Sequence, residues 1–249
     1  MTIIHNSRIL DRLPSAILFD TDNTLYPYNP SHEAAMEAVR TKVSRLFTIS
    51  HNQFDEAFGM ARNEVKSRLR NTASSHSRLL YFQRMLELIG LGSQVLMALD
   101  FEQTYWRTFL SSAALFDGVK DFLDDLRIIG IPTAIVTDLT AQIQFRKIVY
   151  FGLDQYFNFV ITSEEAGFDK PHSAPFELAV QKMQPESDCI WMIGDDPVAD
   201  IGGARKAIGA FTIQKVHKGV IVGKDENKPD VEIKSFESLR KILQKLQAS

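Results

Sequence analysis

Two aspartates stand directly after an apolar run near the start of the chain, in ILFDTDNTL (17–25). Asp20 follows the run, and Asp22 lies two positions further on. Burying a carboxylate costs free energy unless a cation or hydrogen-bond donors meet it, and neighbouring carboxylates raise each other's pKa. The pair therefore predicts a cation or a set of donors at this point of the fold.

Polar side chains also stand at the ends of the later apolar runs. They occur at the end of PTAIVT (132–137), in EEAGFDKP (164–171) and in GDDPVAD (194–200). In open parallel sheets, ligands bind beyond the carboxyl ends of the strands. The side chains expected to meet there are Asp20, Asp22, Thr137, Asp138, Lys170, Asp195, Asp196 and Asp200. Carboxylates, a hydroxyl and a lysine at one edge predict a metal and an anion held in one crevice.

The carboxylates of this set predict a magnesium site. Asp20, Asp22 and Asp195 can share a hard divalent cation, and oxygen-only ligation that leaves positions for water and phosphate suits Mg2+. Zinc is not expected, because the six histidines show no paired spacing and Cys189 is the only cysteine. Thr137 can donate a hydrogen bond to a phosphoryl oxygen. Lys170 can neutralise charge on both the phosphate and the attacking carboxylate.

Short apolar runs predict the strands that position these side chains. The runs are AILF (16–19), PTAIVT (132–137), FNFVIT (157–162), CIWMI (189–193) and GAFTIQKV (209–216). Helical patterns separate the later runs or follow them, namely AQIQFRKIVYFG (141–152), APFELAVQKM (174–183) and SFESLRKILQKLQ (235–247). Strands that alternate with helices predict right-handed crossovers and a parallel sheet. The expected fold class is therefore α/β, with a doubly wound parallel sheet.

Residues 28–112 interrupt this alternation, because they show helical periodicity and no convincing strand. Four apolar stripes at helical spacing predict four helices, and such stripes usually form a core. One stripe consists of Val95, Leu99, Trp106 and Leu110. We expect two domains: a core formed by residues 1–27 and 113–249, and an inserted four-helix domain formed by residues 28–112.

The composition is that of an ordinary soluble globular protein. The 249 residues include 28 Lys and Arg against 31 Asp and Glu, for a net charge of -3, so no basic excess points to nucleic acid. No lysine-rich tract points to an anionic membrane, and the N-terminal stretch has no long apolar core typical of a signal peptide or membrane span. We therefore expect a cytoplasmic protein whose partner is a small molecule. The sequence does not indicate an oligomeric state.

Four segments, in this order, resemble the signature segments of the haloacid dehalogenase superfamily. They are FDTDNTL, AIVTD, GFDKPHSAPF and IGDDPVADIGGARKAIG. The predicted helical domain follows the first segment, where one subclass of that superfamily carries its cap. The resemblance thus implies a Rossmann-like core with an all-helical cap. Two positions depart from it: Asp138 stands where relatives often carry Asn, and His172 stands where they often carry an acid.

The resemblance implies that the opening aspartate pair carries the chemistry. Asp20 would be the nucleophile that forms an aspartyl-phosphate. Asp22 would be the general acid and base, with its backbone carbonyl on the metal. An aspartate at this second position is typical of phosphatases and phosphomutases, whereas relatives that cleave carbon–halogen bonds generally lack it.

The resemblance also implies roles for the other strand-end residues. Thr137 and Lys170 would hold the phosphoryl group, and Asp138 would lie close to it with its backbone N–H available to the phosphate. Asp195 would ligate Mg2+. Asp200 would ligate the metal through a water that it orients, or would orient the lysine. Asp196 is ambiguous between those two tasks.

These features predict a Mg2+-dependent phosphomonoester hydrolase that acts on a small soluble metabolite, either a nucleotide or a sugar phosphate. A phosphomutase needs the same core residues and is an alternative. A non-catalytic phosphorylation-receiver module is a further alternative, but receivers place their lysine after the last strand, whereas Lys170 precedes GDDPVAD. His76 and Arg78, in SSHSRLLYF of the insertion, are candidate substrate contacts, although surface exposure is the expected state of both.

Overall fold

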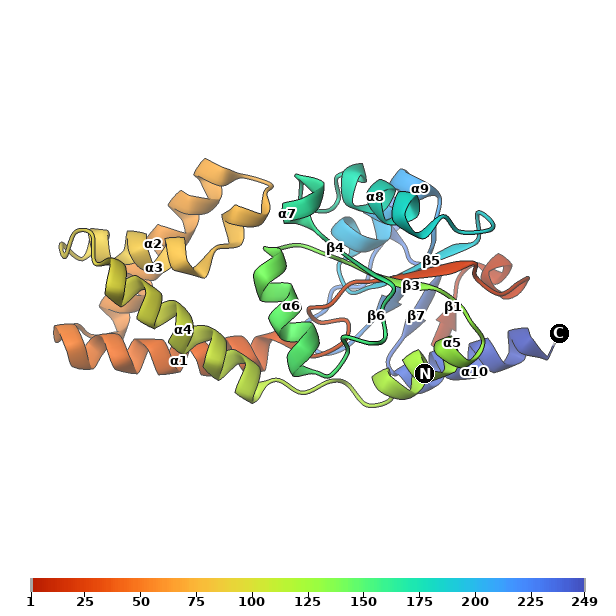
Figure 1. Ribbon diagram of the computed structural model, residues 1–249, viewed down its shortest axis with the longest axis horizontal. Helices are drawn as coiled ribbons and strands as arrows, with labels where there is room; N and C mark the ends of the chain where they lie inside the picture. The colour runs from red at the N-terminus through yellow and green to blue at the C-terminus, as the bar shows by residue number, and fades with distance from the viewer. Residues whose placement is uncertain (1, 249) are drawn as a thin grey trace. The chain divides into compact units, whose positions relative to one another are not determined.

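The computed structural model describes residues 2–248, and a seven-stranded sheet forms the centre of its strand-containing part (Figure 1). Its strand order is β1-β7-β6-β5-β2-β3-β4. Neighbouring strands run parallel, except that β1 pairs with β7 in the antiparallel direction. The strands are β1(Thr2–Ile4), β2(Ala16–Phe19), β3(Thr133–Thr137), β4(Phe159–Thr162), β5(Ile190–Gly194), β6(Phe211–Lys215) and β7(Val231–Ile233).

Helices cover both faces of this sheet. The α-helices of this part of the chain are α5(Val119–Ile128), α6(Ala141–Tyr150), α7(Ser163–Ala166), α8(Ser173–Met183), α9(Gly203–Ile208) and α10(Phe236–Gln247), and the shorter turns are η1(Ser7–Leu10), the π-helical η3(Pro197–Gly202) and η4(Asp225–Asn227). In Figure 1, α8 and α9 lie on one face of the sheet and α5 and α10 on the other. This arrangement confirms the doubly wound α/β fold.

Alternating side chains of β2 show how the two faces are filled. Leu18 belongs to the buried cluster that includes Phe176 of α8. Its neighbour Phe19 points the other way, because successive strand residues alternate in direction, and its ring lies 6.2 Å from that of Phe122 in α5. A strand with both faces covered must be apolar throughout. For this reason AILF could be recognised as a central strand from its sequence.

All five predicted strands are confirmed. The remaining two strands, β1 and β7 at one edge of the sheet, were not predicted. Each has only three residues, and neither presents an apolar run like those of the centre. Ile3 and Ile4 of β1 are exposed. These segments therefore become strands because they pair with segments distant in sequence, β1 with β7 and β7 with β6, and not because of their local composition.

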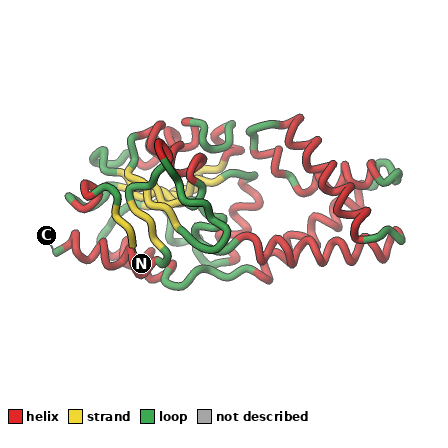
Figure 2. Tube along the Cα trace, turned by 180° about the vertical axis from the view of Figure 1, so that it is seen from behind, coloured by secondary structure: helices red, strands yellow, loops and turns green. Residues whose placement is uncertain are grey.

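Residues Tyr28–Ala113 form a second compact unit, which we call the helical unit; residues 2–27 and 114–248 form the core unit. The helical unit contains helices and loops only (Figure 2). Its elements are α1(Tyr28–Phe47), α2(His51–Leu69), η2(Ala73–His76), α3(Arg78–Leu88) and α4(Val95–Ser112). Two segments of the core unit lead into and out of the helical unit. They are joined by a hydrogen bond, because the N–H of Phe116 donates to the carbonyl of Leu25 at 2.9 Å.

Aromatic rings fill the interior of the helical unit. The ring of Phe82 lies 5.4 Å from that of Phe58, 6.1 Å from that of Phe101 and 6.3 Å from that of Tyr105. Such clusters bury a large apolar area and favour the edge-on and tilted geometries seen here.

Ser50 precedes α2 as its N-cap and forms a capping box with Gln53.

One predicted stripe of this unit is wrong in part. Trp106 is buried, but Val95 is 66% exposed and Leu99 is 41% exposed. The buried face of α4 instead follows Ala98, Phe101, Tyr105 and Phe109. These residues also recur at helical spacing, and their rings occupy the interior, so α4 is rotated away from the face that the aliphatic residues suggested.

None of the helices within residues 2–248 is both long enough and apolar enough to cross a membrane.

We expect Phe82→Ala to lower the free energy of unfolding by about 3–5 kcal/mol, because it removes a fully buried ring and leaves a cavity. Urea unfolding followed by circular dichroism measures the change. Leu96→Ala is the matched control, since Leu96 is 73% exposed and surface changes typically stay within about 0.5 kcal/mol. Equal effects of the two substitutions would contradict this description of the core.

Candidate active site

The carboxyl ends of three neighbouring strands bring the predicted residues together. Asp20 directly follows β2, Thr137 ends β3, and Asp195 directly follows β5. Because β2 lies between β3 and β5 and runs parallel to both, the three ends meet at one edge. The N–H of Asp20 donates to the carbonyl of Ile193 at 2.9 Å, which extends the ladder to the first catalytic candidate.

A buried lysine lies between two of the carboxylates. The Nζ atom of Lys170 donates to Asp20 Oδ1 at 2.7 Å, to Asp200 Oδ1 at 2.6 Å and to the carbonyl of Val136 at 3.0 Å. Burial lowers the pKa of Lys170, but the carboxylates of Asp20 and Asp200 outweigh it and raise this pKa well above its ordinary value. The ammonium is therefore charged, and it compensates part of the negative charge of Asp20.

Three carboxylates of the core unit form an acidic group. Oxygen atoms of Asp20, Asp195 and Asp200 all lie within 4.8 Å of one another. Burial, together with repulsion from the other carboxylates, raises the pKa of Asp20 to about 7 and that of Asp195 to about 9. A set made only of oxygen donors suits a hard divalent cation, and such an ion would offset the repulsion. Asp20, Asp195 and Asp200 were all predicted for this site.

Gly194 makes the position of Asp200 possible. The second carboxylate oxygen of Asp200 accepts the N–H groups of Asp195 at 3.1 Å and Asp196 at 3.0 Å. A Cβ atom added to Gly194 would lie 2.4 Å from both the Cβ and an oxygen of Asp200. Only glycine leaves room for this aspartate to reach Lys170.

The side chain of Asp22 lies outside the acidic group. Its two oxygens accept from Lys147 Nζ at 2.8 and 3.0 Å, and Oδ1 also accepts from the hydroxyl of Tyr26. The Asp22 carboxylate was expected beside those of Asp20 and Asp195, but it lies outside their group, and the ammonium of Lys147 on α6 meets its charge. That the backbone carbonyl of Asp22 ligates a metal stays a prediction.

The predicted phosphate-binding residues are held by local hydrogen bonds. Thr137 Oγ1 accepts from Gln144 Nε2 at 2.8 Å and lies 2.9 Å from the hydroxyl of Thr21. The carboxylate of Asp138 accepts the backbone N–H of Lys170 at 2.9 Å, and burial raises its pKa to about 6. The additional carboxylate at this position is thus used to fix the loop that carries the lysine.

Asp196 contacts the backbone of η3 rather than the lysine. Its Oδ1 accepts the N–H groups of Val198 and Ala199, both at 2.8 Å, at the start of η3. This is a helix-capping role. The side chain that contacts Lys170 is that of Asp200.

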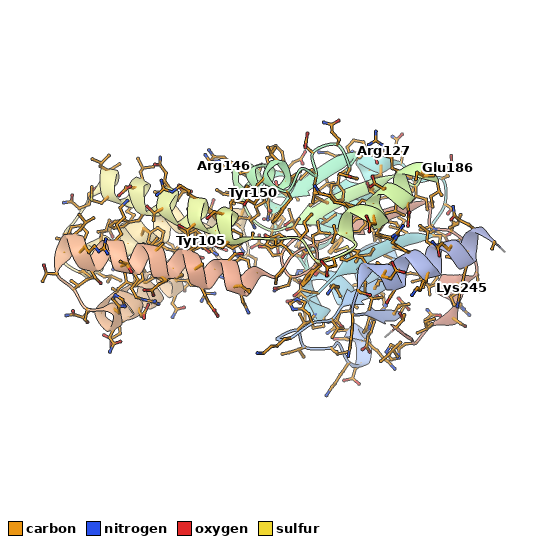
Figure 3. The ribbon with its side chains drawn as sticks, turned by 90° about the horizontal axis from the view of Figure 1, so that it is seen from below. Tyr105, Arg127, Arg146, Tyr150, Glu186 and Lys245 are labelled. Atoms are coloured by element: carbon orange, nitrogen blue, oxygen red, sulfur yellow. The ribbon has the colours of Figure 1, made fainter. Side chains whose placement is uncertain are left out.

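Arg78 differs from the expectation of a solvated side chain. Its guanidinium carbon lies 5.3 Å from the ring of Tyr105, which is labelled in Figure 3, 5.5 Å from that of Tyr81 and 5.8 Å from that of Trp106. Arg78 donates to the carbonyl of His76 at 2.8 Å, while its Nε is buried without a hydrogen-bond partner. Both His76 and Arg78 are half-buried, so surface exposure was the wrong expectation for them.

Sequence reasoning missed two functional neighbours on α6. Gln144 and Lys147 are buried polar residues on the same helix face as Ile143 and Ile148. Residues three and four apart share a helix face. A lysine and a glutamine within the apolar face of AQIQFRKIVY were the signal that could have identified them.

Known proteins resemble this chain over most of its length. A sequence profile of haloacid dehalogenase-like hydrolases matches residues 14–207. A ribulose-1,5-bisphosphate 5-phosphatase of Halopiger xanaduensis is 39% identical over 202 residues, which are 81% of this chain and 84% of that protein. A glyceraldehyde 3-phosphate phosphatase of Methanopyrus kandleri is 26% identical, over 93% of this chain and 97% of that protein. The crystal structure of a phosphatase from Thermococcus onnurineus is similar with a TM-score of 0.69 and 26% identity, covering 92% of this chain and 97% of that one.

We expect Asp195→Asn to flatten the pH dependence of stability when divalent cations are removed with EDTA. The folded pKa of Asp195 is raised to about 9 from 3.8, so the folded state holds a proton that the unfolded chain has lost. Stability therefore falls as pH rises from about 6 to about 8, and the variant should be the more stable protein at the upper end. Thermal unfolding at each pH measures this.

Asp154→Asn, at an exposed position, is the control and should retain the wild-type slope. The assignment of a raised pKa to Asp195 is wrong if its asparagine variant and the wild type show parallel curves.

Proposed function

The chain belongs to the haloacid dehalogenase-like hydrolases, and from this premise we propose that it is a phosphatase that hydrolyses phosphomonoesters of small sugars. The observation that carries the proposal is the buried Lys170 ammonium held between Asp20 and Asp200 beside the carboxylate of Asp195. A positive charge in contact with a candidate nucleophile is suited to bind a phosphoryl group. The names of the Halopiger and Methanopyrus relatives favour a sugar phosphate over a nucleotide.

The first step transfers the phosphoryl group to Asp20. An oxygen of this carboxylate attacks phosphorus, the bond from phosphorus to the sugar oxygen breaks, and the departing oxygen takes a proton from Asp22. Burial raises the pKa of Asp20, and Lys170 acts against this rise, so the lysine favours the ionised nucleophile. The hydroxyl of Thr137, which accepts from Gln144, donates a hydrogen bond to a phosphoryl oxygen.

The second step releases phosphate. Asp22, now ionised, takes a proton from water, the resulting hydroxide attacks phosphorus, and the bond to Asp20 breaks. Asp22 regains the proton that it lost in the first step, so the cycle balances. Lys170 contacts Asp20 throughout and neutralises charge on the phosphoryl group.

Mg2+ is the proposed cofactor. The residues fit this ion, because the acidic group offers carboxylate oxygens alone and contains neither His nor Cys. Asp20, Asp195 and the backbone carbonyl of Asp22 would hold it, with Asp200 acting through a water. When bound, Mg2+ neutralises charge on the transferring phosphoryl group.

We assign the helical unit the role of a cap that recognises the sugar. Arg78 forms no ion pair with a carboxylate anywhere in residues 2–248. A half-buried cation without an acidic partner favours an anionic or hydroxyl-rich ligand. Arg78, with His76 beside it, is therefore the proposed substrate contact of this unit.

A panel of sugar phosphates and nucleotides, with phosphate release as the measured quantity, tests the function. We expect turnover of a sugar phosphate in the presence of Mg2+, reversible loss on chelation because the carboxylates then repel one another, and no turnover by Asp20→Asn. Asp154→Asn, at an exposed position, should match the wild type. Full activity after complete removal of metal would exclude the proposed cofactor, and a panel without any turnover would exclude the function.

We expect Asp22→Asn to separate the two steps. A sugar alkoxide needs a proton in order to leave, so its first step should slow by about 10^2- to 10^4-fold. p-Nitrophenolate leaves without this proton, but the second step still needs a base. With p-nitrophenyl phosphate, the variant should release about one product per active site and then stall as phosphorylated Asp20.

Rapid-mixing kinetics and intact-mass measurement detect the burst and the trapped phosphoenzyme. Asp22 is not the proton donor if the first step slows equally for aryl and sugar phosphates.

A further inference from the structure

Helix α6 carries two buried polar side chains that reach the candidate active site. Gln144 is fully buried and Lys147 is 1% exposed. The first donates to Thr137, and the second donates to Asp22. The exposed side of the same helix carries Arg146 and Tyr150 (Figure 3). One face of α6 therefore touches two residues of the proposed reaction, while the other faces solvent.

The contact with Lys147 compensates the charge of the Asp22 carboxylate and also restricts its orientation. Nζ lies 2.8 Å from one oxygen of the carboxylate and 3.0 Å from the other. A cation that contacts both oxygens restricts rotation of the carboxylate about its own axis. The hydroxyl of Tyr26 donates to the same Oδ1, so two buried donors hold the Asp22 carboxylate in one orientation.

Packing holds these donors in place. The ring of Tyr26 is buried against that of Phe151, with centroids 4.8 Å apart, and Lys147 Nζ lies 5.9 Å from the Tyr26 ring. Burying an ammonium is costly unless an anion meets it with good geometry. Here the anion is a side chain that is itself 35% exposed, and the lysine contacts both of its oxygens.

We propose that Lys147 is a positioning residue, which holds the ionised Asp22 carboxylate in the orientation that accepts a proton from water in the second step. The proposal rests on the proposed phosphatase function. A base must lie within hydrogen-bond reach of the proton that it takes, and a misplacement of about 1 Å can cost about 10^2-fold in rate. The ion-paired Asp22 of this structure is the form needed after it has given its proton to the leaving group.

Lys147→Met tests this inference, because methionine keeps the length and burial of the side chain but removes the ammonium. With p-nitrophenyl phosphate and Mg2+, the first step should stay within about threefold of the wild type. The breakdown of phosphorylated Asp20 should slow by about 10- to 100-fold, so that a burst appears. Arg146→Met, the neighbouring exposed cation, should show no burst. Rapid mixing follows both steps, and circular dichroism checks folding.

A double-mutant cycle shows whether the lysine acts through Asp22. In an Asp22→Asn background, Lys147→Met should slow phosphoenzyme breakdown by less than about twofold, because there is no carboxylate left to orient. Should the methionine variant fail to fold, Lys147→Gln repeats the cycle with a donor that contacts one oxygen, and an intermediate slowing supports the proposal.

Two results overturn it. One is a wild-type rate of breakdown in Lys147→Met, and the other is an equal slowing in the presence and absence of Asp22. Both leave the phosphatase function standing, since the wild type still turns over. A wild type that never becomes phosphorylated on Asp20 removes the function and this inference together.

Discussion

The contact of one buried ammonium with two buried carboxylates determines much of this structure. Lys170 can be buried only because Asp20 and Asp200 accept from it, and these aspartates can lie close together only because it separates them. Each needs its own support. Asp20 directly follows a central strand, Asp200 fits only because Gly194 has no side chain, and the loop that carries Lys170 is held by Asp138. Removing any one partner would leave an uncompensated charge in the interior, which is strongly destabilising.

The carboxylates of the site differ in how far their charge is compensated. Three of its carboxylates have a raised pKa because burial and mutual repulsion exceed what a single lysine compensates. Asp22, by contrast, has a lysine of its own on α6. The first group therefore suits a further cation, whereas the charge of Asp22 is already compensated by Lys147. This difference separates carboxylates suited to hold a metal from one suited to exchange protons.

The sequence allowed prediction of the parts in which local composition decides the outcome. AILF and CIWMI are short and apolar throughout, so they could only be central strands, and the polar residues at their ends had to meet. The partner of Asp22 could not be predicted, because Lys147 lies 125 positions away and reaches it only through the packing of α6. The same limit applies to Val231–Ile233, which becomes a strand through pairing with β6, and to α4, whose rotation depends on rings contributed by other helices.

The hydrogen bond between Phe116 and Leu25 has a consequence for how such a protein changes over evolution. It brings together the two points at which the helical unit leaves and rejoins the core unit. A segment whose ends are already adjacent adds little loop-closure entropy, whatever its length. The 86 residues between Tyr28 and Ala113 can thus be lengthened, shortened or replaced by recombination without altering strand order. Such an exchange leaves Asp20, Asp22 and the other strand-end side chains of the core unit unchanged.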